Sequence, residues 1–111
     1  MRARPILLAA IPLFRLAAAT ADDAPPLYRE VKEALSKRCT QCHSNDVDWH
    51  GYYEAQAGIR YDTAEEVRTF AKQTFRTVTQ TRIMPPGNIT GMTDEERKLV
   101  ADWFAAGAKT P

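Results

Sequence analysis

The stretch Cys39-Thr40-Gln41-Cys42-His43 contains both cysteines of the 111-residue chain and has the spacing of an attachment site for a c-type haem. At this spacing, each thiol can add across one vinyl group of the same porphyrin, which forms a pair of thioether bonds. His43 follows directly, so its imidazole can lie under the iron as the proximal axial ligand. The pattern therefore predicts one covalently attached haem held by Cys39, Cys42 and His43.

Other uses of a Cys-x-x-Cys pair require residues that the sequence lacks. A structural zinc site needs further Cys or His ligands, and His50 alone remains. A thioredoxin-like redox pair follows a strand in a βαβ unit, and no such alternation precedes Cys39. A plain disulfide would leave His43 without a role. Haem attachment accounts for all three residues together.

The N-terminal segment has the pattern of a secretory signal peptide. A basic region is followed by a short apolar run over residues 6–14, and Ala19-Thr20-Ala21 forms a small-x-small cleavage site. The run is much shorter than the ~18 residues of a membrane-spanning helix. We therefore expect a signal peptide at 1–21, one mature domain at 22–111 and a periplasmic location, where c-type haem is normally attached. An uncleaved amphipathic anchor is the alternative.

Charge and length limit the function classes. The net charge is +1, and cleavage would remove Arg2, Arg4 and Arg15, which leaves a mildly acidic protein. Such a chain has no basic patch suited to nucleic acid. A chain of this length buries only a modest apolar area, so a large flat cofactor would supply much of the core.

Periodicity predicts an all-α fold with three main helices and long loops. The first helix follows Pro25-Pro26 and carries Leu27, Val31 and Leu35 on one face that leads into the haem motif. Residues 44–62 lack periodicity and should form a long loop. Its aromatic residues and its arginine either pack on the porphyrin and bond its propionates or fill a small core within the loop. These residues are Trp49, Tyr52, Tyr53, Arg60 and Tyr61.

Capping boxes mark the starts of the other helices. Thr63 with Glu66 opens the second helix, and Thr93 with Glu96 opens the third. Gly107 is a natural stop for the third helix. The second helix should be continuous, with an apolar face made of Val67, Phe70, Ala71, Thr74 and Val78. The third should present Leu99, Val100, Trp103 and Phe104.

Met84 is the predicted distal ligand. A thioether sulfur suits haem iron and raises its reduction potential, and Pro85-Pro86 should stiffen the loop and keep Met84 out of a helix. Met92 is the rival, although its place before the cap Thr93 is typical of a hydrophobic staple. His50 would give bis-histidine iron, but it lies so close to the motif that we expect it on the surface.

With these motifs, the sequence resembles class I monohaem cytochromes c over nearly all of the predicted mature chain. The resemblance implies a small cytochrome c fold around one covalent haem, in which the first and last helices cross and one haem edge is exposed. A closer likeness is to the C-terminal cytochrome c domain of membrane-bound urate hydroxylases. It rests on Gly58-Ile59, on Asp62-Thr63 and on the stretch from Met84 to Arg97, MPPGNITGMTDEER.

The chain departs from the family at one point. Many class I cytochromes have a proline after the haem motif whose carbonyl accepts a hydrogen bond from the proximal histidine. No proline occurs between His43 and Met84. The carbonyl of Gly58 or Ile59 is expected to take this role.

The expected function is electron transfer in the periplasm by Fe(II)/Fe(III) cycling, with His43 and Met84 as axial ligands and without enzymatic activity. The expected partners are redox proteins: a donor dehydrogenase or oxidase domain and an acceptor such as a terminal oxidase. Contact with a membrane would occur only through a partner or an uncleaved signal segment. The alternatives are a cytochrome subunit of a membrane-bound urate- or purine-oxidising enzyme and a haem-based ligand sensor.

Overall fold

The computed structural model describes residues 2, 3, 5 and 25–111. It contains the helices α1 (Pro26–Arg38), α2 (Ala64–Thr69), α3 (Ala71–Phe75) and α4 (Asp94–Ala105). Three short helical turns lie between them: η2 (Gln56–Gly58), η3 (Arg76–Gln80) and η4 (Pro86–Asn88). The described residues form no β-strand, and an isolated bridge joins Trp49 and Tyr52. The prediction of an all-α fold is confirmed.

The predicted cleavage site after Ala21 and nearly all of the predicted signal peptide lie outside the described residues. Of the helices in the described ranges, none combines the length and the apolar character needed to cross a membrane.

Helix α1 starts and ends as its sequence predicts. Proline occupies its first turn, where the missing N–H needs no partner. Val31 and Leu35 are fully buried, and Leu27 packs at the edge of the same apolar cluster. The last turn closes through the Cys39 N–H, which donates to the Leu35 carbonyl at 2.8 Å. The helix therefore delivers its buried face directly to the Cys-x-x-Cys-His motif.

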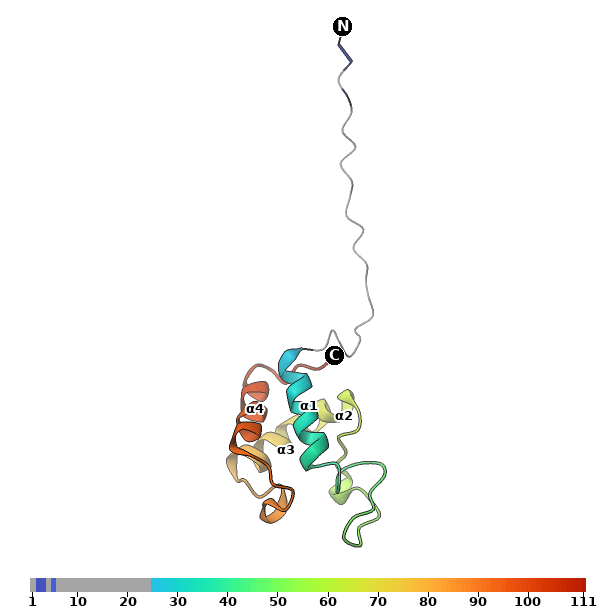
Figure 1. Cartoon of the computed structure of the whole chain (residues 1–111), viewed down its shortest axis with the longest axis vertical. Helices are drawn as coiled ribbons and strands as arrows, with labels where there is room; N and C mark the ends of the chain where they lie inside the picture. Colours follow the sequence, from blue (N-terminus) through green and yellow to red (C-terminus); the bar gives the residue numbers. More distant parts are fainter. Residues whose placement is uncertain (1, 4, 6–24) are drawn as a thin grey trace.

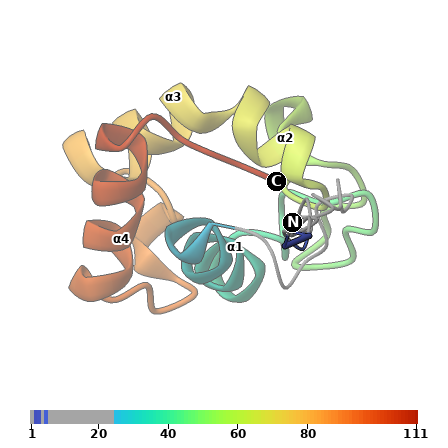
Figure 2. The same cartoon turned by 90° about the horizontal axis from the view of Figure 1, so that it is seen from above.

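The helices surround one central core. Seen from above, α1, α4 and the α2–α3 pair occupy three sides of the molecule (Figure 2). Helix α1 packs on α4, as the resemblance implies for the first and last helices. The largest fully buried side chains come from all of these elements: Val31, Leu35, Val67, Thr74, Val78, Val100 and Trp103.

The prediction of one continuous second helix is wrong. The segment breaks at Phe70, which ends α2 and caps α3, and α3 passes into the π-turn η3. Threonine hydroxyls donate to carbonyls four residues earlier, from Thr74 to Phe70 and from Thr79 to Phe75. The Thr74 N–H also donates to the Phe70 carbonyl, at 2.9 Å, and an added hydroxyl bond of this kind often bends a helix. The predicted apolar face survives, because Val67, Thr74 and Val78 are buried.

Both capping boxes are confirmed. At α2, the Glu66 N–H donates to the Thr63 hydroxyl and the Thr63 N–H donates to the Glu66 carboxylate. Thr93 and Glu96 make the same pair at α4. Helix α4 ends before Gly107, which adopts a φ of 103° in the region that favours glycine.

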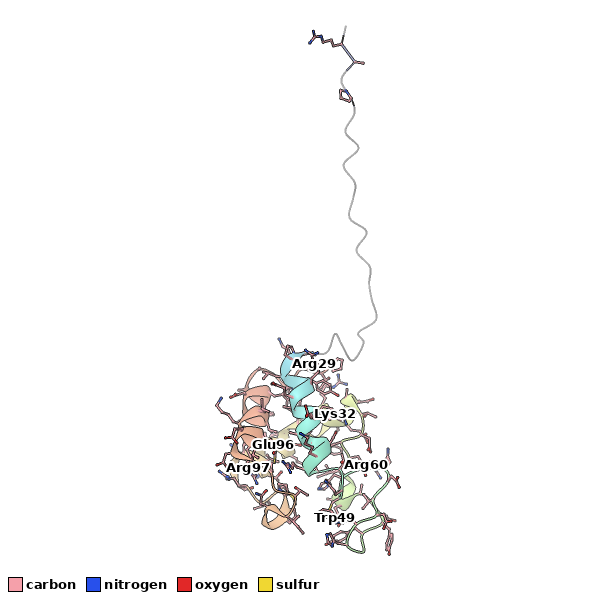
Figure 3. The ribbon with its side chains drawn as sticks, viewed as in Figure 1. Arg29, Lys32, Trp49, Arg60, Glu96 and Arg97 are labelled. Atoms are coloured by element: carbon pink, nitrogen blue, oxygen red, sulfur yellow. The ribbon has the colours of Figure 1, made fainter. Side chains whose placement is uncertain are left out.

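Glu96 also joins α4 to the end of α1. Its carboxylate accepts from Arg38 Nε at 3.0 and 3.3 Å, and Arg38 Nη1 donates to the Thr90 carbonyl at 2.7 Å. Burial alone would raise the pKa of Glu96, but hydrogen bonds from Thr93 and Arg38 outweigh it and lower that pKa. Figure 3 labels Glu96 near α1. The ionised carboxylate is thus the form that stabilises the fold.

We expect this ion pair to make stability dependent on acid. Because the folded-state pKa of Glu96 is depressed, its contribution is complete above the unfolded value of about 4.3 and is lost as the pH falls through the folded value. The Glu96→Gln variant keeps a capping-box side chain and loses the charge. It should cost about 1–2 kcal/mol at pH 7. Urea unfolding of both proteins at pH 7 and pH 3 measures this, and an equal difference at both pH values would contradict it.

Candidate haem site

A single cleft brings together the residues that the sequence marked. It has an empty volume of about 720 Å³ that includes open solvent, and most of its lining residues come from the end of α1, the long loop after it and the segment before α4. In Figure 1 this loop and this segment lie at the lower end of the molecule. Its walls contain the predicted site residues Cys39, Cys42, His43 and Met84. The other lining residues are Arg38, Trp49, Tyr52, Gln56, Tyr61, Thr77, Val78, Pro85, Pro86, Ile89 and Thr90.

The motif forms a tight turn at the end of α1. The N–H groups of Cys42 and His43 donate to the Cys39 carbonyl at 3.1 and 2.9 Å, which places both thiols and the imidazole along one wall. Cys39 and Cys42 are free thiols. Burial raises the pKa of Cys39 to about 12, and the nearby Glu96 charge adds to the rise. The Cys39 thiol is therefore protonated at neutral pH.

His43 is oriented by the long loop. Its Nδ1 lies 3.0 Å from the Ile59 carbonyl, so Nδ1–H donates there and Nε2 is left for a metal. The expectation that the carbonyl of Gly58 or Ile59 accepts a hydrogen bond from His43 is confirmed for Ile59. Backbone bonds hold the same contact, since the Tyr61 N–H donates to the His43 carbonyl at 3.0 Å and the Gln56 N–H to the Cys42 carbonyl at 2.9 Å.

Tyr61 supports the imidazole from the side. Its ring meets that of His43 edge-on, with centroids 5.8 Å apart. Its hydroxyl lies 2.7 Å from the Thr74 Oγ1, which itself donates to the Phe70 carbonyl, so Tyr61 donates and Thr74 accepts. Burial raises the pKa of Tyr61 to about 12. The phenol therefore stays protonated and acts as a fixed wall of the cleft.

The other loop residues divide between the cleft and the surface. Trp49 and Tyr52 line the cleft, and Figure 3 shows Trp49 at the same lower end of the molecule. Tyr53 is 78% exposed and lies outside the lining. Arg60 is half-buried and donates to the Gly58 carbonyl at 3.4 Å, also outside the lining.

Met84 reaches the cleft from the segment between η3 and η4. Its side chain is half-buried, and the two prolines behind it line the same cleft. Its N–H donates to the Thr77 carbonyl at 3.1 Å, and its carbonyl accepts from Arg97 Nη1 at 2.8 Å. The backbone on both sides of the thioether is thus tied to the helical frame.

The rival ligands lie elsewhere. Met92 is 4% exposed within the apolar core and does not line the cleft. His50 is exposed beside Trp49, with ring centroids 4.4 Å apart, and is also absent from the lining.

Arg82, two residues before Met84, forms a surface ion pair with Asp94 at 2.7 Å. Such a pair contributes little to stability.

The lining fits a covalent haem. The donor set is suitable, because a soft sulfur and an imidazole with a fixed tautomer are an axial pair of haem proteins. Within residues 2, 3, 5 and 25–111, no cluster of His, Cys, Asp and Glu has the ligands for a zinc site.

Sequence reasoning missed several contributors. Arg38, Thr77, Ile89 and Thr90 also line the cleft. Arg97 donates a hydrogen bond to the Met84 carbonyl. Its burial could have been predicted from the sequence, because it lies three residues before Val100 on the buried face of α4.

Comparisons of the chain with protein-family models, curated proteins and solved structures found no match.

Proposed function

We propose that this protein is a periplasmic electron carrier with one c-type haem and a cytochrome c fold of the class I type. Cys39 and Cys42 would attach the haem, and His43 and Met84 would ligate its iron. The observation that carries the proposal is that both thiols, the imidazole and the thioether line one cleft. All four residues lie in the described part of the chain.

The bound haem would supply one-electron Fe(II)/Fe(III) chemistry. The residues of the chain would hold both axial positions, so the site would offer no position for a substrate. The Ile59 carbonyl fixes the His43 tautomer, and the backbone ties at Met84 fix the segment that carries the sulfur. Little rearrangement on electron transfer is the expected consequence.

The rim of the cleft suits brief contact with a redox partner. Tyr52 and Ile89 line the cleft and are 47% and 59% exposed. Apolar residues at the mouth, within a protein of balanced charge, support docking to a donor dehydrogenase or oxidase domain and to an acceptor such as a terminal oxidase. Interfaces of this kind are small and weak, and their charged parts should be sensitive to salt.

Covalent attachment is the direct test. The full chain is expressed with a periplasmic haem-maturation system, beside the single variants Cys39→Ala and Cys42→Ala. We expect the wild-type polypeptide to keep one haem after denaturation, as mass spectrometry measures. Each single variant should keep only one thioether, which shifts the reduced α-band of the denatured haem because one vinyl group remains unreacted.

The double variant Cys39→Ala/Cys42→Ala serves as the control and should lose all haem on denaturation. A wild-type protein that gains no mass under conditions that mature another c-type cytochrome would disprove the proposal.

A further inference from the structure

Arg97 is a buried arginine without an acidic partner. Its side chain lies on α4 and is 7% exposed, whereas arginine is seldom buried unless it is paired. The ion pairs found in the described part of the chain do not include it. A buried charge is costly unless neighbouring dipoles compensate it. The groups to which Arg97 donates hydrogen bonds therefore indicate its structural role.

All of its hydrogen-bond partners belong to the segment that carries Met84. Nη1 donates to the carbonyls of Val78 and Met84, each at 2.8 Å, and Nη2 donates to Asn88 Oδ1 at 3.3 Å. Nε has no hydrogen-bond partner among the residues that the structure describes. Arg97 thus contacts η3, η4 and the segment that joins them.

The fold leaves these carbonyls in need of a donor. Val78 lies in the π-turn η3, after which the helix ends at Thr81, and Met84 lies in a segment that belongs to no helix or strand. The Met84 N–H is already bonded to the Thr77 carbonyl. The planar guanidinium supplies both missing bonds from one side. Figure 3 labels Arg97 on α4.

We propose that Arg97 is a positioning residue that keeps the Met84 thioether in place as the distal ligand and thereby keeps the site closed to external ligands. The inference rests on the proposed function. On this inference, Arg97 determines whether the protein is a carrier with a permanent sixth ligand or a protein that binds small molecules at the iron.

Charge and geometry can be separated at this site. The Arg97 charge lowers the pKa of the Cys39 thiol against its net rise, so its field reaches the wall of the cleft. Lysine would keep the charge but has one nitrogen, so it cannot reproduce the two Nη groups that reach the two carbonyls and Asn88 together. Methionine would keep much of the volume and remove both. Arg97→Lys and Arg97→Met therefore test the geometry with and without the charge.

The experiment uses the haem-loaded full chain. The first readout is the weak far-red absorption band of thioether-ligated Fe(III), followed as the pH is raised. The second is the rate of CO binding to the reduced protein. Removal of a charged hydrogen bond should raise the open fraction of the site by about 10- to 100-fold. Arg97→Met should lose the band at lower pH and bind CO faster by this factor, and Arg97→Lys should lie between it and wild type.

A matched control separates positioning from general destabilisation. Val31→Ala removes core volume on α1, where the side chain is fully buried, and touches no residue of the Met84 segment by hydrogen bond. It should unfold at lower urea but keep the band and the slow CO binding of wild type.

Each outcome is decisive. If wild type shows the far-red band, and both Arg97 variants keep this band and the wild-type rate of CO binding, the inference is overturned but the proposed function is not. The same holds if Val31→Ala binds CO as fast as the Arg97 variants. A wild type without the band overturns His/Met ligation and the inference with it. If Arg97→Met does not fold, Arg97→Gln replaces it, because the shorter neutral amide removes the charge and cannot reproduce the guanidinium contacts with both carbonyls. No change in Arg97→Gln and Arg97→Lys then overturns the inference.

Discussion

Replacing Met84 with alanine is expected to abolish the far-red band of the oxidised protein and to open the iron to CO. The thioether is the only sulfur among the cleft-lining residues besides the two thiols that we assign to haem attachment. On the proposed ligation, its loss would remove a ligand that favours Fe(II). Axial ligands and their surroundings spread haem potentials over about 0.8 V, and we expect this variant to fall by at least about 0.1 V.

The measurement is a redox titration of wild type and Met84→Ala, with CO binding followed in the reduced state. Met92→Leu is the matched control, because Met92 is buried in the core and a leucine of similar volume should preserve the packing. It should keep the band and the potential. If Met92→Leu loses the band and Met84→Ala keeps it, the ligand assignment is wrong.

The features that sequence alone predicted are local ones. Each capping box joins residues three positions apart, as at Thr63 with Glu66, and the burial of Val31 and Leu35 follows from a four-residue spacing. The turn after Cys39 is equally local. In these cases the physical cause and the sequence pattern lie within one helical turn, so no knowledge of the tertiary structure is needed.

What sequence did not reveal depends on distant partners. The break at Phe70 lies in a helical pattern of good periodicity, and the Thr74 hydroxyl that donates to the Phe70 carbonyl is itself bonded to Tyr61 of the long loop. Arg97 looks like an ordinary charged helix residue until the carbonyls of Val78 and Met84 are in place around it. For the Ile59 carbonyl, the sequence narrowed the choice to two neighbours, and the path of the loop decided between them.

Trp103→Ala is expected to cause the largest loss of stability. The side chain is 1% exposed in the cluster that contains Leu35 and Cys39, and its Nε1–H donates to the Lys109 carbonyl at 2.9 Å. Truncation of a buried tryptophan leaves a large cavity and costs about 3–5 kcal/mol. Small domains are stable by about 5–15 kcal/mol, so the variant should lose a large part of its free energy of unfolding. Urea unfolding of the haem-loaded protein measures this change.

Trp103→Phe refines the argument, because it keeps most of the ring packing and loses the hydrogen bond to Lys109. It should cost less than alanine, with about 1 kcal/mol assigned to the bond. Tyr53→Ala, at a side chain that is 78% exposed, should change stability by no more than about 0.5 kcal/mol. Because Trp103 shares its cluster with Cys39, loosening the core should also loosen the wall that holds the haem. If Trp103→Ala had the same free energy of unfolding as Tyr53→Ala, the packing between α1 and α4 would not be a main source of the stability of the fold.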